Sequence, residues 1–372
     1  MIPYGRQSID EHDIEAVVAV LRSDWLTQGP AVEAFEADLA ERVEARHAVV
    51  FANGTAALHG AMAAGGIGPG DRVLTSPLSF VASANCGRFV GADVGFVDID
   101  PATWNIDLDA VTACDALVAV HYAGLPVELD ELERRGNRPR LVVEDACHAL
   151  GARTPSGPVG NCAHSDMTVF SFHPVKTITT GEGGAVTTNS DELADALRRF
   201  RCHGMVRRPE LGGWYYEIDE LGYNYRMTDL QAALGRSQLA KLGSFVAMRN
   251  ALADRYRRRF AEFAPPGLVL PPAPAPDTRH AYHLFPVLVS DRNHVYDQLR
   301  ELGIGAQVHY LPIYRHPLYA RAGFDPASFP VTEHVFHGVL SLPLHPTLTR
   351  SEQDTVIEAV VRVLTGESRL AA

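Results

Sequence analysis

Lys176 is the residue of this sequence with the clearest chemical potential. It lies just past the apolar run MTVFSFH (167–173) and just before the stretch TITTGEGG. Only two of the 33 basic residues are lysines, Lys176 and Lys241. An arginine stays charged, whereas a lysine amine can lose its proton and attack a carbonyl carbon to form a Schiff base. A composition this poor in lysine disfavours a solvent-exposed loop lysine at 176 and indicates a nucleophile.

A carboxylate and an imidazole follow a second apolar run, in the stretch LVVEDACHALG (141–151). Asp145 stands at the end of this run, and His148 comes three residues later. Open α/β sheets bind ligands at the carboxyl ends of their strands, which is where Asp145 would lie. The alternative for Asp145 is a simple helix N-cap. Cys147 and His148 have no further ligand pair nearby, so the sequence predicts no metal site.

A phosphate group would suit the stretch Asn53-Gly54-Thr55, which separates a predicted strand (47–52) from a predicted helix. Amides at a helix N-terminus bind phosphate well, although a plain tight turn is the alternative here. Ser171, five residues before Lys176, adds a hydroxyl to the same group. Four further polar residues next to predicted element ends suit ordinary turn or strand positions equally well: Asn224, Arg226, His309 and Tyr310.

Together these residues describe a single ligand. It has a phosphate, a carbonyl carbon that Lys176 could attack, and a basic ring nitrogen that a buried Asp145 would keep protonated. Pyridoxal 5′-phosphate carries all three groups and is bound in enzymes through a lysine Schiff base and an acidic partner for its ring nitrogen. The sequence therefore predicts pyridoxal 5′-phosphate as the cofactor.

The elements that must position these residues are indicated by short apolar runs that alternate with helical segments. Such a pattern favours an α/β fold with a mostly parallel sheet covered by helices on both faces. Ser8 and Glu11 have the spacing of a capping box at the start of a first helix. Near the other end, AQVHYLPIY (306–314) is predicted to be a strand, and a helix is predicted from about residue 350.

A domain boundary is predicted at the proline-dense segment APPGLVLPPAPAPDTRH (264–280). One helical stretch is expected over roughly 228–262, and the prolines cannot continue it. We therefore expect a large α/β domain over 1–263 and a smaller C-terminal α+β domain over 264–372.

Composition bounds the class of protein. The net charge of −12 and the lack of a Lys/Arg run argue against a nucleic-acid binder. The five cysteines are odd in number and form no CxxC pair, which is typical of free thiols in a reducing cytoplasm. No apolar stretch approaches 18 residues, and the N-terminus has no apolar signal core. These features predict a soluble cytoplasmic protein that does not associate with membranes.

The sequence also resembles one protein family, the nucleotide-sugar aminotransferases of the DegT/DnrJ/StrS type. The similarity covers nearly the whole chain and is carried by SDWLTQGP (23–30), NGTAAL (53–58), SFVASAN (79–85), VVEDACHALG (142–151), FSFHPVKTITTGEGGAVTTN (170–189), GYNYRMTDLQAALG (222–235) and VLSLPLHP (339–346). It implies the aspartate-aminotransferase fold (fold type I of pyridoxal-phosphate enzymes), in which a mostly parallel seven-stranded sheet is covered by helices. Some family members are dehydratases with histidine in place of the lysine, so Lys176 favours transamination.

The resemblance also implies a role for each site residue. Lys176 would form the Schiff base, Asp145 would pair with the ring nitrogen, and Phe80 would lie against one face of the ring. His148, where some relatives have glutamine, would sit near the ring hydroxyl or the opposite face. Gly54, Thr55 and Ser171 would hold the phosphate, and Asn224 would reach the phosphate of a neighbouring subunit in a homodimer with shared active sites. The nucleotide-sugar or amino-donor cleft would be lined by Tyr4, Asp24, Trp25, Leu26, Thr27, Asn53, Arg226, His309 and Tyr310.

Within the family, the opening MIPYGRQSID, the HPVK context, WYYEIDELGYNYR and VHYLPIY look most like the UDP-4-amino-4,6-dideoxy-N-acetyl-β-L-altrosamine transaminases of pseudaminic acid biosynthesis. The expected reaction moves an amino group from L-glutamate to the 4-keto carbon of a UDP-linked 6-deoxy-N-acetyl-hexosamine. One alternative keeps the cofactor but takes a dTDP- or GDP-linked 4-keto or 3-keto sugar. Another is a non-catalytic regulator or scaffold on the same fold. A Rossmann dehydrogenase is disfavoured because no GxGxxG follows the first strand.

Overall fold

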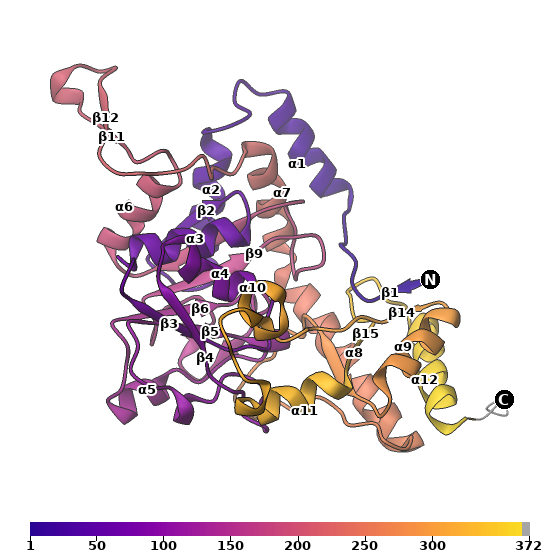
Figure 1. Cartoon of the computed structure of the whole chain (residues 1–372). Helices are drawn as coiled ribbons and strands as arrows, with labels where there is room; N and C mark the ends of the chain where they lie inside the picture. Colours follow the sequence, from indigo (N-terminus) through magenta and orange to yellow (C-terminus); the bar gives the residue numbers. More distant parts are fainter. Residues whose placement is uncertain (367–372) are drawn as a thin grey trace.

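The computed structural model describes residues 1–366, and its centre is a seven-stranded sheet with strand order β2–β10–β9–β6–β5–β3–β4 (Figure 1). The strands are β2 (His47–Phe51), β3 (Arg72–Thr75), β4 (Asp93–Phe96), β5 (Ala116–Val120), β6 (Leu141–Asp145), β9 (Met167–Ser171) and β10 (Gly184–Thr188). Only β10 runs antiparallel to its neighbours; the other pairs are parallel. The predicted mostly parallel seven-stranded sheet is therefore confirmed.

Two helical layers cover the sheet, and the strands show why. Successive residues of a strand point to opposite faces, and Val49 packs into one core cluster whereas Val50 packs into the other. On the Val50 side lie α2 (Pro30–Arg42) and α7 (Asp229–Ala240), which contribute Phe35 and Leu239. On the Val49 side the layer consists of α3 (Gly54–Ala64), α4 (Ala82–Phe89) and α6 (Asp191–Phe200). The short helix α5 (Asp130–Arg135) follows β5, and β7 (Arg153–Thr154) and β8 (Gly157–Pro158) form a small hairpin.

The C-terminal part forms its own core around an antiparallel pair, β13 (Phe285–Leu288) and β15 (Val339–Leu342). Around it lie α8 (Leu242–Phe263), α9 (Arg292–Glu301), α11 (Pro330–Gly338) and α12 (Arg350–Thr365). The short helix α10 (Pro317–Ala320) instead packs against α4, through Tyr319 and Ala84. Tyr256 and Phe260 of α8 pack into this core, and β1 (Ile2–Pro3) pairs with β14 (Ile304–Gly305) (Figure 1). The boundary at residue 264 stays a prediction, and residues 367–372 of the predicted second domain lie outside the described residues.

Three local predictions were wrong. The first helix, α1 (Glu11–Leu21), is capped by Asp10, whose partner in the capping box is Asp13, not by Ser8 and Glu11. The stretch 228–262 is two helices that meet at Lys241. The residues AQVHYLPIY form no strand; Gln307 makes one isolated bridge to Ser341, and Pro312 has no amide to extend a ladder.

A two-stranded hairpin, β11 (Met205–Arg207) and β12 (Tyr216–Ile218), extends away from the body of the molecule (Figure 1). Several of its apolar side chains are exposed, among them Trp214 at 80% and Ile218 at 57%. Among residues 1–366, no helix combines the length and the apolar character that crossing a membrane requires.

Candidate active site

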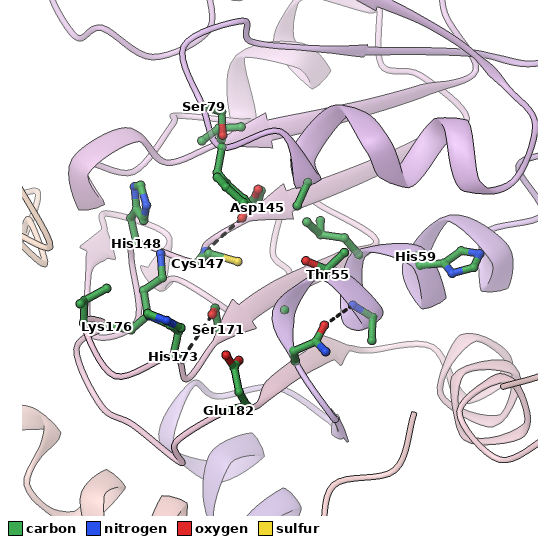
Figure 2. A pocket seen from close by; sticks show the side chains of 18 of the residues that line it. Thr55, His59, Ser79, Asp145, Cys147, His148, Ser171, His173, Lys176 and Glu182 are labelled. Carbon is green, nitrogen blue, oxygen red and sulfur yellow. Dashed lines mark hydrogen bonds between the residues drawn. The ribbon is translucent and has the colours of Figure 1, made fainter. Parts of the chain in front are cut away.

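A cavity of about 1010 Å³ opens at the carboxyl ends of the sheet strands, where the residues expected to do chemistry come together (Figure 2). Its walls come from the start of α3, the ends of β6 and β9, and the segment after β14. Eleven of the predicted site residues line it: Tyr4, Asn53, Gly54, Thr55, Phe80, Asp145, His148, Ser171, Lys176, His309 and Tyr310.

Lys176 lies on the loop that follows β9, where its amide donates a hydrogen bond to the carbonyl of His173 (2.8 Å). Burial lowers the pKa of the Lys176 ammonium, while nearby Cys147 and Asp145 act in the opposite direction. A lowered pKa makes the neutral amine easier to reach near neutral pH, which is what a nucleophilic lysine needs. Figure 2 places its side chain next to His148, on the same side of the cavity.

Asp145 is the last residue of β6 and is only 6% exposed. Its Oδ2 accepts a hydrogen bond from Ser83 Oγ (2.6 Å), and its Oδ1 accepts one from the amide of Cys147 (3.2 Å). Within residues 1–366 it forms no ion pair with a basic side chain. The carboxylate is therefore held by neutral donors, and its charge is available to a cationic ligand.

The start of α3 forms a cradle for a phosphate. Asn53 is the N-cap, and its side chain accepts from the amide of Ala56 (2.8 Å), while the preceding helical amides have no intrahelical acceptor. A Cβ at Gly54 would lie 3.0 Å from Ser171 Cβ and 3.3 Å from Ser171 Oγ, so glycine keeps the space beside that hydroxyl open. Free amides, a hydroxyl and an open backbone fit the phosphate of the predicted cofactor.

Histidine and tyrosine side chains line a further part of the cavity wall. Tyr310 Oη and His148 Nε2 are hydrogen-bonded (3.0 Å), and the rings of His148 and His283 lie 4.3 Å apart. Burial lowers the pKa of His148 well below its ordinary value, with a further contribution from Lys176. Burial also lowers the pKa of His309 to about 4. The imidazoles of His148 and His309 are therefore neutral at pH 7, so they do not pair as cations with the carboxylate of Asp145.

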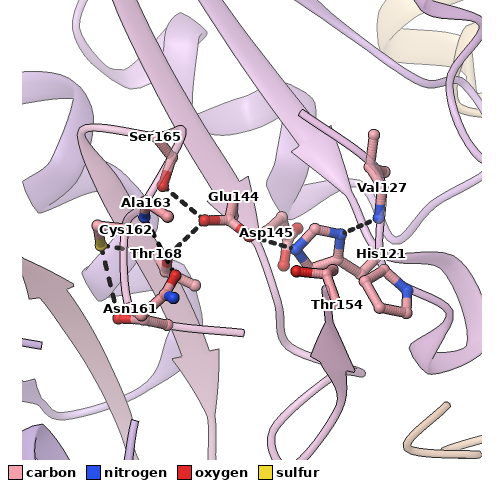
Figure 3. Close-up of polar contacts among 12 residues, drawn as sticks. His121, Val127, Glu144, Asp145, Thr154, Asn161, Cys162, Ala163, Ser165 and Thr168 are labelled. Atoms are coloured by element: carbon pink, nitrogen blue, oxygen red, sulfur yellow. Dashed lines mark hydrogen bonds and ion pairs between the residues drawn. The ribbon is translucent and has the colours of Figure 1, made fainter. Parts of the chain in front are cut away.

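On the opposite face of β6 from Asp145, Glu144 is the centre of a buried polar network (Figure 3). It accepts hydrogen bonds from His121 Nε2 (2.7 Å), Ser165 Oγ (2.5 Å) and Thr168 Oγ1 (2.8 Å). Burial opposes the charged form, but the donors outweigh it and lower the pKa of Glu144. Because these donors belong to the segments on either side of β6, the network fixes the end of the strand that carries Asp145.

Sequence reasoning missed several residues that the fold brings to the cavity: His59, Ser79, Cys147, Glu182, Tyr223, Tyr225 and His283. It also missed Ser83, which contacts Asp145 from behind the cavity wall. Ser79 and Ser83 are four residues apart at the start of a helix. This spacing, which makes side chains neighbours on a helix, is the signal from which the pair could have been predicted. His283 has no comparable signal, because its place depends on the packing of β13.

Six predicted site residues do not line the cavity within this single chain: Asp24, Trp25, Leu26, Thr27, Asn224 and Arg226. The segment 24–27 is exposed and follows α1; the carbonyl of Leu26 accepts from the amide of Asp229 (3.0 Å). Arg226 points to Cys202 Sγ (3.5 Å), and Asn224 is exposed. Their roles stay predictions.

The fold and the site together define a class of enzyme. A lysine, a buried carboxylate and a phosphate cradle at one edge of a mostly parallel sheet are the arrangement of an enzyme that depends on pyridoxal phosphate. Residues 7–361 match the model of the DegT/DnrJ/EryC1/StrS aminotransferase family. The chain belongs to this family, so the predicted family and enzyme class, a sugar aminotransferase that depends on pyridoxal phosphate, are confirmed.

The chain is similar to named relatives over almost its whole length. It is 39% identical to the spore coat polysaccharide biosynthesis protein SpsC of Bacillus subtilis, over 98% of this chain and 97% of the relative. It is 35% identical to the UDP-4-amino-4,6-dideoxy-N-acetyl-beta-L-altrosamine transaminase of Campylobacter jejuni, over 98% of both chains. The solved structure of Helicobacter pylori PseC, an aminotransferase involved in pseudoaminic acid biosynthesis, superposes with a TM-score of 0.91 at 32% identity, covering 98% of this chain and 100% of the other.

Proposed function

We propose that this enzyme binds pyridoxal 5′-phosphate at Lys176 and transfers an amino group from L-glutamate to the 4-keto carbon of a UDP-linked 6-deoxy-N-acetyl-hexosamine. The product would be UDP-4-amino-4,6-dideoxy-N-acetyl-β-L-altrosamine, a precursor of pseudaminic acid. The observation that carries the proposal is the pairing of Lys176 with Asp145 in one cavity beside the phosphate cradle. Its volume of about 1010 Å³ leaves room for a substrate next to a cofactor.

Each residue assigned to the cofactor has a defined task in this proposal. Pyridoxal 5′-phosphate, when bound, supplies a carbonyl for Lys176 and a cationic ring that takes up an electron pair from the amino acid's α-carbon. Asp145 holds the proton on the ring nitrogen. The Nζ atom of Lys176, once the amino donor has displaced it, would take the proton from the α-carbon of glutamate, and in the second half of the reaction it would deliver a proton to C4 of the sugar. The amides of Gly54 and Thr55 and the hydroxyl of Ser171 hold the phosphate.

The choice of sugar is supported by the Campylobacter jejuni and Helicobacter pylori proteins, whose names give this reaction or this pathway. One observation favours a second candidate. The identity to SpsC, a protein of spore coat polysaccharide biosynthesis, is higher at 39%. We therefore keep a dTDP- or GDP-linked keto sugar of another polysaccharide or natural-product pathway as the alternative substrate.

The visible absorption of bound pyridoxal 5′-phosphate tests the proposal. L-glutamate should bleach the band, and addition of a UDP-4-keto-6-deoxy-N-acetyl sugar of the L series should restore it. Restoration by the D-series sugar or by dTDP-4-keto-6-deoxyglucose instead would establish the alternative substrate. A colourless protein that takes up no added cofactor would point to a regulator or scaffold on this fold.

Lys176→Ala is the matched variant for this experiment. It should remain folded and still bind the cofactor through the phosphate cradle, but its absorption should be that of the free aldehyde. Turnover should fall by several orders of magnitude, as expected for the loss of a covalent and proton-transferring group. Turnover at the wild-type rate would contradict the assignment of Lys176.

We also propose a homodimer in which Asn224 of one subunit reaches the phosphate site of its partner. Support comes from the exposed apolar side chains of α1 and of the β11–β12 hairpin, which the single chain leaves uncovered. The cytoplasmic location stays a prediction from the sequence.

A further inference from the structure

Within residues 1–366, the carboxylate of Asp145 accepts a hydrogen bond from one side chain, that of Ser83. The hydroxyl of Ser83 lies 2.6 Å from Asp145 Oδ2, at the short end of the range for hydrogen bonds to a charged acceptor. In the same part of the chain, the other oxygen accepts only from the amide of Cys147, at 3.2 Å. Ser83 is fully buried in the first turn of α4, so water does not replace its hydroxyl.

The hydroxyl of Ser79 determines the direction in which the hydroxyl of Ser83 donates its hydrogen bond. Ser79 Oγ lies 2.7 Å from Ser83 Oγ, and Ser79 lines the cavity (Figure 2). A hydroxyl has one proton to donate. Since the proton of Ser83 goes to Asp145, Ser79 must donate to Ser83. The carbonyl of Phe80, 3.2 Å from Ser83 Oγ, is a second, more distant acceptor for the Ser83 proton.

We propose that Ser83, directed by Ser79, is a positioning residue that aims the carboxylate of Asp145 at the ring nitrogen of the cofactor. A short hydrogen bond from a buried hydroxyl fixes the orientation of the carboxylate that accepts it. Without Ser83, the side chain of Asp145 rotates more freely, so it holds the proton on the ring nitrogen less well. This inference rests on the role of Asp145 in the proposed function.

The test compares Ser83→Ala with the wild type and with Ser76→Ala. Ser76 is buried in the loop that leads from β3 to α4, and its hydroxyl accepts from the amide of Leu78 (3.2 Å). We expect Ser83→Ala to raise the dissociation constant of pyridoxal 5′-phosphate about tenfold or more, the usual effect of losing a hydrogen bond to a charged group. We expect Ser76→Ala to bind the cofactor like the wild type.

Two further readouts separate positioning from mere structural support. The visible band of the bound cofactor changes with pH as the Schiff-base nitrogen at Lys176 gains or loses its proton, and the midpoint of this titration should move upward in Ser83→Ala. A ring nitrogen that is less firmly protonated withdraws less electron density from the Schiff-base nitrogen, which is then more basic. The value of kcat should fall about tenfold, while the KM for the sugar changes little. Ser79→Ala should shift the midpoint in the same direction by a smaller amount. Ser83→Cys, which keeps a weak donor in nearly the same volume, should lie between Ala and the wild type.

Asp145→Asn distinguishes the failure of this inference from the failure of the proposed function. If Asp145→Asn shifts the band but Ser83→Ala and Ser76→Ala both behave like the wild type, the role of Ser83 is refuted and that of Asp145 stands. If Asp145→Asn also leaves the band and the affinity unchanged, the cofactor does not depend on Asp145 and the proposed function is wrong. Should Ser83→Ala fail to fold, Ser83→Cys decides, since a wild-type midpoint in that variant overturns the inference.

Discussion

At the scale of single residues, Gly54 and Ser171 show how little space the phosphate cradle leaves. A side chain at 54 would approach Ser171 Cβ to 3.0 Å and Cys147 Sγ to 3.5 Å. The hydroxyl that we assign to the phosphate would then have to move or turn away. Alanine is otherwise the better helix former, so glycine at this position favours the site over the helix.

Gly54→Ala should therefore bind pyridoxal 5′-phosphate about tenfold more weakly or worse, because one charge-assisted hydrogen bond is lost or displaced. Its thermal unfolding should stay close to that of the wild type, since α3 gains a favoured residue. Titration of the apoprotein with the cofactor measures the effect. Gly68→Ala, where nothing lies within 4 Å of the added carbon, is the matched control. Equal affinity of Gly54→Ala and wild type for pyridoxal 5′-phosphate would contradict the assignment of Gly54 to the phosphate site.

The role of Lys241 is explained by the structure and could not be predicted from the sequence. Its ammonium is bonded to Asp13 (2.6 Å) and Asp10 (2.8 Å) at the start of α1, and Asp13 is fully buried. Gln238 and Ser237 of α7 donate to the same carboxylate, both at 2.7 Å. The second of the two lysines thus fastens α1 onto α7, whereas the sequence marked lysine only as scarce.

At the scale of elements, the strands and most helices could be predicted because each has a local signal. The run LVVED is buried at every position of β6, and the helix after Asn53 begins where the predicted phosphate site required it. At the break between α7 and α8, Lys241 is bonded to Asp10 and Asp13, and Gln307 in the stretch 306–314 pairs with Ser341; these partners are distant in sequence. Lys176 could be predicted as a site residue because lysine is scarce in this sequence. Asp145 could be predicted because it stands at the end of an apolar strand. Ser83 and His283 reach the site through tertiary packing, which no local pattern encodes.

Two elements with exposed apolar side chains are α1 and the β11–β12 hairpin. On α1, Ile14 is 48% and Leu21 is 57% exposed, although Asp13 on the same helix is buried against α7. Beside the hairpin, Trp214 and Leu221 are about 80% exposed. A helix with one buried face and a second apolar face, together with an extended ribbon rich in apolar side chains, suits an interface with a second copy of the chain.

Light scattering should therefore give about twice the chain mass of 40.4 kDa for the wild type. The double variant Trp214→Ser/Leu221→Ser should weaken the dimer about tenfold or more, as expected when large buried apolar contacts are lost at an interface. Leu318→Ser, at a leucine that is 56% exposed on α10, is the matched control and should stay dimeric. A monomeric wild type at micromolar concentration would contradict the shared active site.

At the scale of the whole molecule, the described structure buries several neutral histidines where the C-terminal part meets the large sheet. Burial lowers the pKa of His280 to about 3 and that of His309 to about 4. His280 Nδ1 accepts a hydrogen bond from the amide of Tyr282 (2.8 Å), and His309 Nδ1 is bonded to Ser341 Oγ (2.9 Å). Protonation of His280 at Nδ1 would break its bond, so this packing holds only the neutral imidazole.

This packing makes stability depend on pH in a definite direction. In the unfolded chain a histidine has a pKa of about 6.5, so between pH 6.5 and about 4 the unfolded state binds more protons than the folded state. The free energy of unfolding is therefore highest above pH 6.5 and falls as the pH is lowered through this window. Each such histidine contributes a slope of about 1.4 kcal/mol per pH unit.

Urea unfolding at several pH values between about 4.5 and 7.5, at one protein concentration, measures this slope. His280→Asn keeps an acceptor near the position of Nδ1 but does not titrate, so its slope should be smaller than that of the wild type by about one proton. His12→Asn, at a histidine whose side chain is 88% exposed, is the control and should leave the slope unchanged. If the free energy of unfolding of His280→Asn falls with the same slope as that of the wild type, the acid sensitivity comes from other groups. In that case burial of a neutral His280 does not account for the pH dependence of the packing between the two parts of the molecule.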